Sequence, residues 1–164
     1  MGANSWLDSF EATRNMVPLA DRQKMAEYTQ FRQDGMNNLS AYIKEITGAA
    51  MGVQEEGRIR EGMPDPKKDS PIQFESKMKN SIATTKLALA RHSFLKANGY
   101  DDNTISTLAK NDKLGTILSL DDMKSIINKR LGQAAEQIKA QNPNITPQAL
   151  QENLRVIQRR EFGI

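Results

Sequence analysis

The stretch from Ser70 to Gly99 constrains the fold most, because a helix start, a helix interior and a helix stop all occur within it. Ser70 is a capping residue, Pro71 suits the first helical position, and Gln73 completes an S-x-x-Q capping box. Asn98-Gly99 is typical of a left-handed helix exit. Between the two ends, one buried stripe is predicted from side chains at helical spacing: Phe74, Met78, Ile82, Thr85 and Leu89. The sequence therefore predicts a long helix at about 71–98.

Two helices are predicted directly before this stretch. The first runs from Leu19 to Thr47, with a kink or break near Asp34–Asn37, because Gly35 costs about 1 kcal/mol in a helix interior relative to alanine. The second runs from Val53 to Met63. It is expected to point Glu55, Glu56 and Arg60 outward and to bury Ile59 and Met63.

Two further segments flank these helices. An amphipathic helix is expected from Asn4 or Ser5 to just before Pro18, with Trp6, Leu7 and Phe10 on one side. The connector at residues 64–70 is rich in proline and is expected to be stiff and exposed, neither helix nor strand. Such a segment either turns the chain sharply, which is the commoner case, or forms a short extended epitope.

Short helices are predicted after Gly99. Asp101 or Asp102 caps one with Ile105 and Leu108, and Asn111 caps a turn with Leu114, Ile117 and Leu118. Ser119 and Asp122 start a helix that ends at Gln141, with a buried line of Met123, Ile126, Ile127, Leu131 and Ile138. Thr146 and Pro147 start a terminal helix whose stripe is Leu150, Leu154 and Ile157. No stretch alternates as a strand does, so the fold class predicted is all-α, a bundle of about seven helices in a compact or an elongated form.

Length and charge bear on domain organisation. The 164 residues fit a single helical domain, 1–164. Residues 1–66 carry a net charge of −3 and residues 67–164 a net charge of +6, which together give the total of +3. Two sub-modules are therefore conceivable, an acidic one at 1–63 and a basic one at 70–164, joined by the connector 64–70.

Several kinds of chemistry are excluded or disfavoured. The chain has no cysteine, which removes disulfides, thiol nucleophiles and thiolate metal sites. His92 is the single histidine, so no zinc motif with two histidines exists. The acidic pairs Asp101-Asp102 and Asp121-Asp122 stand at helix starts, where the helix dipole explains them. We expect no catalytic residue, no cofactor and no metal. No run of apolar residues is long enough for a membrane span, and no secretion signal is indicated.

Basic residues gather in the second part of the chain and suit contact with a polyanion or another partner. Without stacking aromatic residues they favour contact with a nucleic-acid backbone and no reading of sequence. The candidates are Lys77, Lys86, Arg91, Lys96, Lys129, Arg130, Arg155, Arg159 and Arg160.

The segment from Ala41 to Ile82 resembles internal virion proteins, or DNA-ejection proteins, of tailed bacteriophages. The resemblance is carried by the turn Ile46-Thr47-Gly48-Ala49-Ala50-Met51, by Glu55-Glu56 followed by Arg58-Ile59-Arg60, and by Met63-Pro64, Asp69-Ser70-Pro71, Phe74 and Lys77. It covers about a quarter of the chain. It implies a helical assembly module whose packing cluster would be Ile46, Met51, Ile59, Met63 and Phe74.

The function expected is that of a non-enzymatic structural or assembly component of a phage virion, at an internal, portal–tail or DNA-ejection position. Its partners would be further copies of itself, other virion proteins and, by backbone contact, DNA. It would reside in the virion and, during assembly, in the host cytoplasm. The alternative is a cytoplasmic nucleic-acid-binding or DNA-packaging factor. A peptidoglycan-degrading enzyme is the third and weakest hypothesis.

Overall fold

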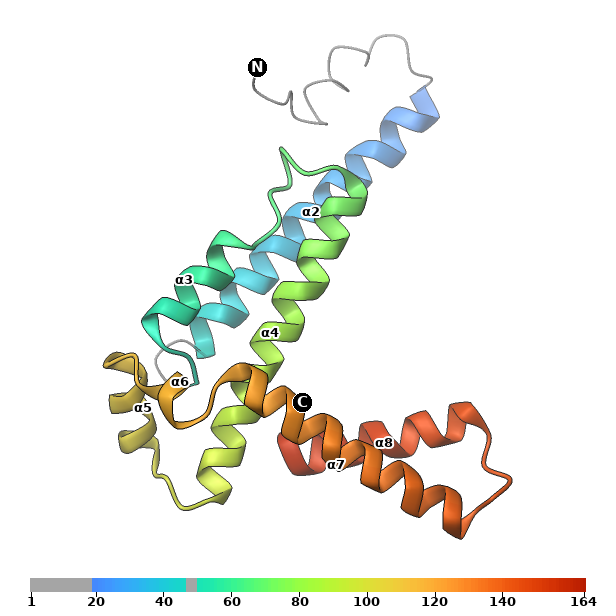
Figure 1. Ribbon diagram of the computed structural model, residues 1–164. Coiled ribbons are helices and arrows are strands. Elements are labelled where there is room, and N and C mark those ends of the chain that lie inside the picture. Colours follow the sequence, from blue (N-terminus) through green and yellow to red (C-terminus); the bar gives the residue numbers. More distant parts are fainter. Residues whose placement is uncertain (1–18, 47–49) are drawn as a thin grey trace. The chain divides into compact units, whose positions relative to one another are not determined.

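The computed structural model describes residues 19–46 and 50–164, which contain seven α-helices and no strand. The helices are α2 (Leu19–Ile46), α3 (Val53–Glu61), α4 (Pro71–Ala97), α5 (Asp102–Lys110), α6 (Leu114–Ile117), α7 (Leu120–Gln141) and α8 (Pro147–Phe162) (Figure 1). The predicted all-α class is confirmed. The helix predicted before Pro18 lies outside the described residues. Within residues 19–46 and 50–164, no helix is long and apolar enough to cross a membrane.

Both ends of α4 form as the sequence predicts. The backbone N–H of Gln73 donates to Ser70 Oγ (3.3 Å), and the backbone N–H of Ser70 donates to Gln73 Oε1 (3.0 Å), which completes the capping box. At the other end Gly99 adopts a left-handed φ of 92°. The N–H groups of Gly99 and Tyr100 then donate to carbonyl groups in the last turn of the helix, as in a Schellman motif.

The buried face of α4 differs in part from the predicted stripe. Phe74 and Thr85 are buried as expected, whereas Ile82 is 38% exposed. The other buried positions include side chains too small or too polar to enter an apolar pattern: Ser81, Ala88, Ala90 and Arg91, together with Leu95. The stripe predicted from large apolar residues is therefore wrong in part. Small residues such as alanine and serine are also buried where another element packs closely on the helix, and a pattern of large apolar residues does not include them.

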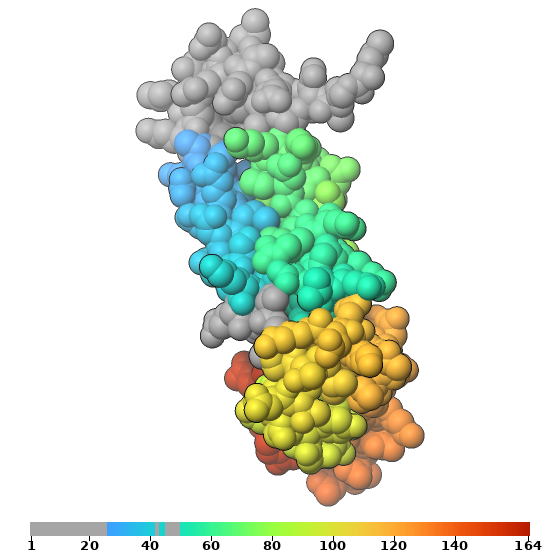
Figure 2. Space-filling model, turned by 90° about the vertical axis from the view of Figure 1, so that its left-hand side faces the viewer, coloured from blue at the N-terminus to red at the C-terminus, as the bar shows by residue number. Residues whose placement is uncertain are grey.

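The described residues form two compact units. The first unit comprises residues 19–45 and 58–83, and the second comprises residues 46, 50–57 and 84–164. The boundary between them falls inside α3 and α4, and the connector 64–70 lies within the first unit. In the first unit, the surface of α2 (blue) lies against the green surface of the segment that follows it (Figure 2).

Helix α2 runs through Gly35 without a break, so the predicted interruption near Asp34–Asn37 is wrong. A Cβ placed on Gly35 would meet Met78 Cε of α4 at 3.4 Å. That distance is an ordinary contact, so the packing of α2 on α4 does not require a glycine here. The helix continues because a cost of about 1 kcal/mol at one position does not break a helix of 28 residues.

The connector is neither helix nor strand, as predicted, but it is less exposed than predicted. Pro64 and Asp69 are buried, and only Lys67 and Lys68 in its middle are fully on the surface. The backbone N–H of Asp65 donates to Asp69 Oδ2 (2.7 Å), and the N–H groups of Lys67 and Lys68 donate to Asp65 Oδ1 (2.8 and 3.2 Å). The two aspartates therefore fold this proline-rich segment into a turn.

The helix starts in the second unit follow the sequence, with one exception. Asp101 caps α5, Ser119 and Asp122 form a capping box on α7, and Thr146 caps α8. Asn111 was predicted to start a turn, but it is the C-terminal cap of α5.

The second unit has two apolar clusters. One is Leu95, Ile105, Ala109 and Leu114. The other consists of Ala90, Met123, Ile127 and Phe162, with Ile126 and Leu131 packed against it. Six residues of the stripes predicted for α7 and α8 are only half-buried: Ile126, Leu131, Ile138, Leu150, Leu154 and Ile157.

Candidate binding groove and buried arginines

An apolar groove of about 660 Å³ lies between α2 and α4 of the first unit. Its apolar lining comes from Tyr28, Phe31 and Leu39 of α2 and from Phe74, Met78 and Ile82 of α4. Phe31 is 68% exposed, which is unusual for a phenylalanine. Sequence periodicity pointed these side chains inward, but it gave no sign that the surface they form is left open.

Arg32 packs against two of the aromatic rings that line this groove. Its side chain is fully buried, and the guanidinium carbon lies 4.2 Å from the centre of the Phe74 ring and 5.7 Å from that of Tyr28. Nη2 donates to the carbonyl oxygen of Asp69 (2.8 Å), and a longer contact reaches that of Asp65 (3.4 Å). Arg32 therefore holds two groove-lining rings and the start of α4 together.

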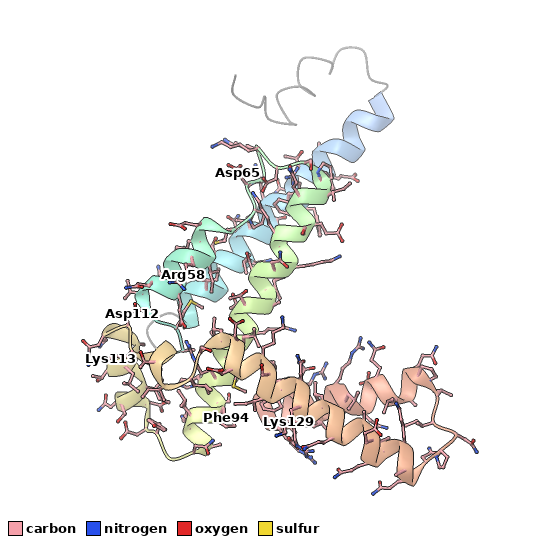
Figure 3. All side chains as sticks on the ribbon, in the orientation of Figure 1. Arg58, Asp65, Phe94, Asp112, Lys113 and Lys129 are labelled. Atoms are coloured by element: carbon pink, nitrogen blue, oxygen red, sulfur yellow. The ribbon has the colours of Figure 1, made fainter. Side chains whose placement is uncertain are left out.

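Asp69 joins this arrangement through Lys77. Lys77 Nζ lies 2.7 Å from Asp69 Oδ1. Burial raises the pKa of Asp69, but the hydrogen bonds from Lys77 and from the backbone of Asp65, with the charges of Lys77 and Arg32, hold that pKa below its ordinary value. The carboxylate is thus ionised at neutral pH and accepts a hydrogen bond from the backbone N–H of Asp65, a residue labelled in Figure 3.

The second unit also contains a buried arginine, Arg91. It was predicted to lie on a basic surface, but it is fully buried. Its two terminal nitrogens donate to Glu55 Oε1 (2.8 Å) and Oε2 (2.6 Å), and further bonds reach the carbonyl oxygens of Ala50 (2.9 Å) and Leu118 (3.2 Å). Glu55 was predicted to point outward, yet its side chain is only 17% exposed. A guanidinium held in this way is unavailable to a nucleic acid, so Arg91 is corrected to a structural residue.

Most of the other basic candidates have a carboxylate partner. Besides Lys77, the pairs are Lys96 with Asp102 (2.9 Å), Arg155 with Glu152 (3.6 Å), and both Arg130 (2.7 Å) and Arg160 (3.3 Å) with Glu161. The fork of Arg130 on α7 binds both oxygens of Glu161 on α8 and so closes the α7–α8 hairpin. Lys86, Lys129 and Arg159 are exposed, and no carboxylate of the described residues pairs with them. Lys129 is seen on α7 in Figure 3.

The predicted packing residues fall in different places. Ile59 and Phe74 are buried and Met63 half-buried in the first unit, while Met51 is buried in the second. The side chain of Ile46 lies outside the described ones.

The titratable residues considered for chemistry serve helix ends and ion pairs. His92 Nε2 lies 3.3 Å from Asp102 Oδ1, and a hydrogen bond from Lys96 is the main cause that lowers the pKa of Asp102. In the described ranges no group of three or more histidine, aspartate or glutamate residues is arranged to hold a metal ion.

Comparison with known proteins finds no match: no family model, no curated protein and no solved structure is similar to the chain.

Proposed function

We propose that the protein is a non-enzymatic assembly protein whose copies associate through the apolar groove between α2 and α4. The observation that carries this proposal is the exposure of Phe31 in a groove whose lining is mostly apolar, with Asn38, Glu75 and Lys79 as its polar side chains. Contiguous exposed apolar surface is costly in water and is typical of sites where another protein binds. An amphipathic helix laid into such a groove is a common mode of recognition.

The state of the carboxyl groups supports a role without catalysis. Hydrogen bonds and positive charges outweigh burial and lower the pKa of five carboxyl groups: Asp69, Glu75, Asp101, Asp102 and Glu161. A general acid working at neutral pH needs a raised pKa. These groups are instead suited to holding helix ends and ion pairs.

The setting we propose is the virion of a tailed bacteriophage, at an internal, portal–tail or DNA-ejection position. This part of the proposal rests on the resemblance of Ala41–Ile82 described above. Mass spectrometry of purified particles tests it directly, because a virion component is recovered at a fixed copy number, whereas a factor that works only in the host cytoplasm is absent from the particle.

Light scattering after size exclusion tests the association itself. We expect the mass of the full chain to rise with concentration, and we expect Phe31→Glu to reduce the association because a charge would then face the groove. Val53→Glu is the matched control, since Val53 is 64% exposed and does not line the groove. A full chain that stays monomeric at every concentration would overturn the proposal.

A further inference from the structure

The groove has the length of a short helix. Along α2 it extends from Tyr28 to Leu39, about 17 Å at a rise of 1.5 Å per residue. Along α4 it extends from Phe74 to Ile82, about 12 Å. An occupant therefore needs about three helical turns with apolar residues on one face.

Residues 4–17 of this chain have that length and that pattern. As a helix the segment would be about 21 Å long. Trp6, Phe10 and Val17 would share one face with Leu7 at its edge, because four and seven residues are close to whole helical turns. Polar residues, Asp8, Glu11 and Asn15, would take the other side. Such anchors at i and i+4 are what helix-in-groove binding uses.

The segment of the same chain is poorly placed to fill its own groove. It joins α2 through Pro18, so a helix folded back along α2 would bring Phe10 level with about residue 26 and Trp6 level with about residue 30. Leu39 and Ile82 would then remain uncovered. A segment supplied by another molecule is not tied to that register and can cover the whole groove.

We propose that the groove of each copy binds residues 4–17 of a neighbouring copy, with Trp6 and Phe10 on the surface formed by Phe31, Met78 and Ile82. This inference rests on the proposed function, since it names the segment through which copies associate. The contact joins two different surfaces, and repetition of it produces a ring or an open chain of molecules.

Complementation between two full-length variants tests the proposal. The segment variant is Trp6→Ala with Phe10→Ala, which keeps an intact groove. The groove variant is Phe31→Glu, which keeps an intact segment. We expect each variant alone to be monomeric and an equimolar mixture to double in mass, because one intact groove then meets one intact segment. The control is a mixture of the segment variant with Val53→Glu in place of Phe31→Glu. Because Val53→Glu keeps both an intact groove and an intact segment, we expect it to associate with itself as the natural chain does.

The outcomes separate this inference from the proposed function. If the full chain associates but the segment variant associates equally well, the inference fails and the proposed function stands. If the full chain never associates, the proposed function fails. A mixture that stays monomeric, although the full chain associates, also overturns the inference.

Tryptophan fluorescence gives a second measurement, because Trp6 is the single tryptophan of the chain. Binding in the groove of a neighbour predicts an emission that shifts to the red on dilution and in the Phe31→Glu variant. A blue-shifted emission, typical of a buried tryptophan, that does not depend on concentration would mean that the segment binds its own chain. That result would overturn the inference.

Discussion

At the scale of single residues, two buried arginines organise the molecule, one in each unit. Arg32 combines aromatic stacking with bonds to backbone carbonyl groups, and Arg91 combines a two-pronged carboxylate pair with two more carbonyl groups. Arginine suits both places, because its planar fork satisfies several acceptors at once and keeps its charge when buried.

Arg91→Met is expected to lower the free energy of unfolding by roughly 3–5 kcal/mol, because the half-buried carboxylate of Glu55 loses the guanidinium that binds both of its oxygens. Urea denaturation measures this. Adding Glu55→Gln to the variant should restore part of the loss, since the half-buried negative charge is then removed as well.

Arg155→Met is the matched control for this experiment. Arg155 and Glu152 are both more than half exposed, and pairs of that kind contribute little. Equal losses for Arg91→Met and Arg155→Met would contradict the importance given to the buried pair.

Asp69 predicts a dependence of stability on pH. Its pKa in the folded protein lies below the ordinary value of about 3.9, so its contribution is complete above that value and is lost as the pH falls through the folded pKa. We expect Asp69→Asn to be less stable than the natural chain at pH 7 and the difference to shrink toward pH 3. Unfolding free energies measured at several pH values test this, and a constant difference would contradict it.

At the scale of elements, the boundaries of the helices were predictable because their signals are local. The capping boxes of Ser70 and Ser119 each involve residues three apart, and Gly99 stops α4 through its own φ. The burial of Arg91 was not predictable, because its partners Glu55 and Ala50 lie 36 and 41 residues away. Nothing in a helical pattern distinguishes such an arginine from one on the surface.

Continuity of α2 through Gly35 leads to a prediction about that helix. Gly35→Ala should stabilise the protein by about 0.5–1 kcal/mol, because alanine is the better helix former and the nearby Met78 Cε is the end of a flexible side chain. Gly132→Ala in α7 is the control, since nothing lies within 4 Å of a Cβ there. Thermal unfolding of both variants tests this, and a loss only at position 35 would show that Met78 does not yield.

At the scale of the whole molecule, most of the basic side chains proposed for partner contact in residues 67–164 already pair with carboxylates of the same chain. Of the nine basic candidates, Arg91 is buried against Glu55, and five others pair with carboxylates of the described residues. The sequence gives the net charge of such a region but not its availability, which depends on which helices lie together. The openness of the groove could not be predicted for the same reason.

Binding to DNA is therefore expected to be weak and to depend on few residues. We expect retention on DNA at about 50 mM salt to be lost by about 200 mM, and to be lost already at the lower salt in a variant with Lys86, Lys129 and Arg159 all changed to glutamine. Lys96→Gln, which removes a paired lysine, is the control. Retention that persists at the higher salt would mean that the paired residues also take part.

The folded turn at residues 64–70 has a consequence for proteolysis. Lys67 and Lys68 are exposed and form a dibasic site that trypsin would recognise in an extended chain. Their backbone N–H groups are bound by Asp65, and Asp69 holds the turn closed. Cleavage there has to wait for local opening. The rate of limited digestion should therefore report how often the two aspartates release the backbone.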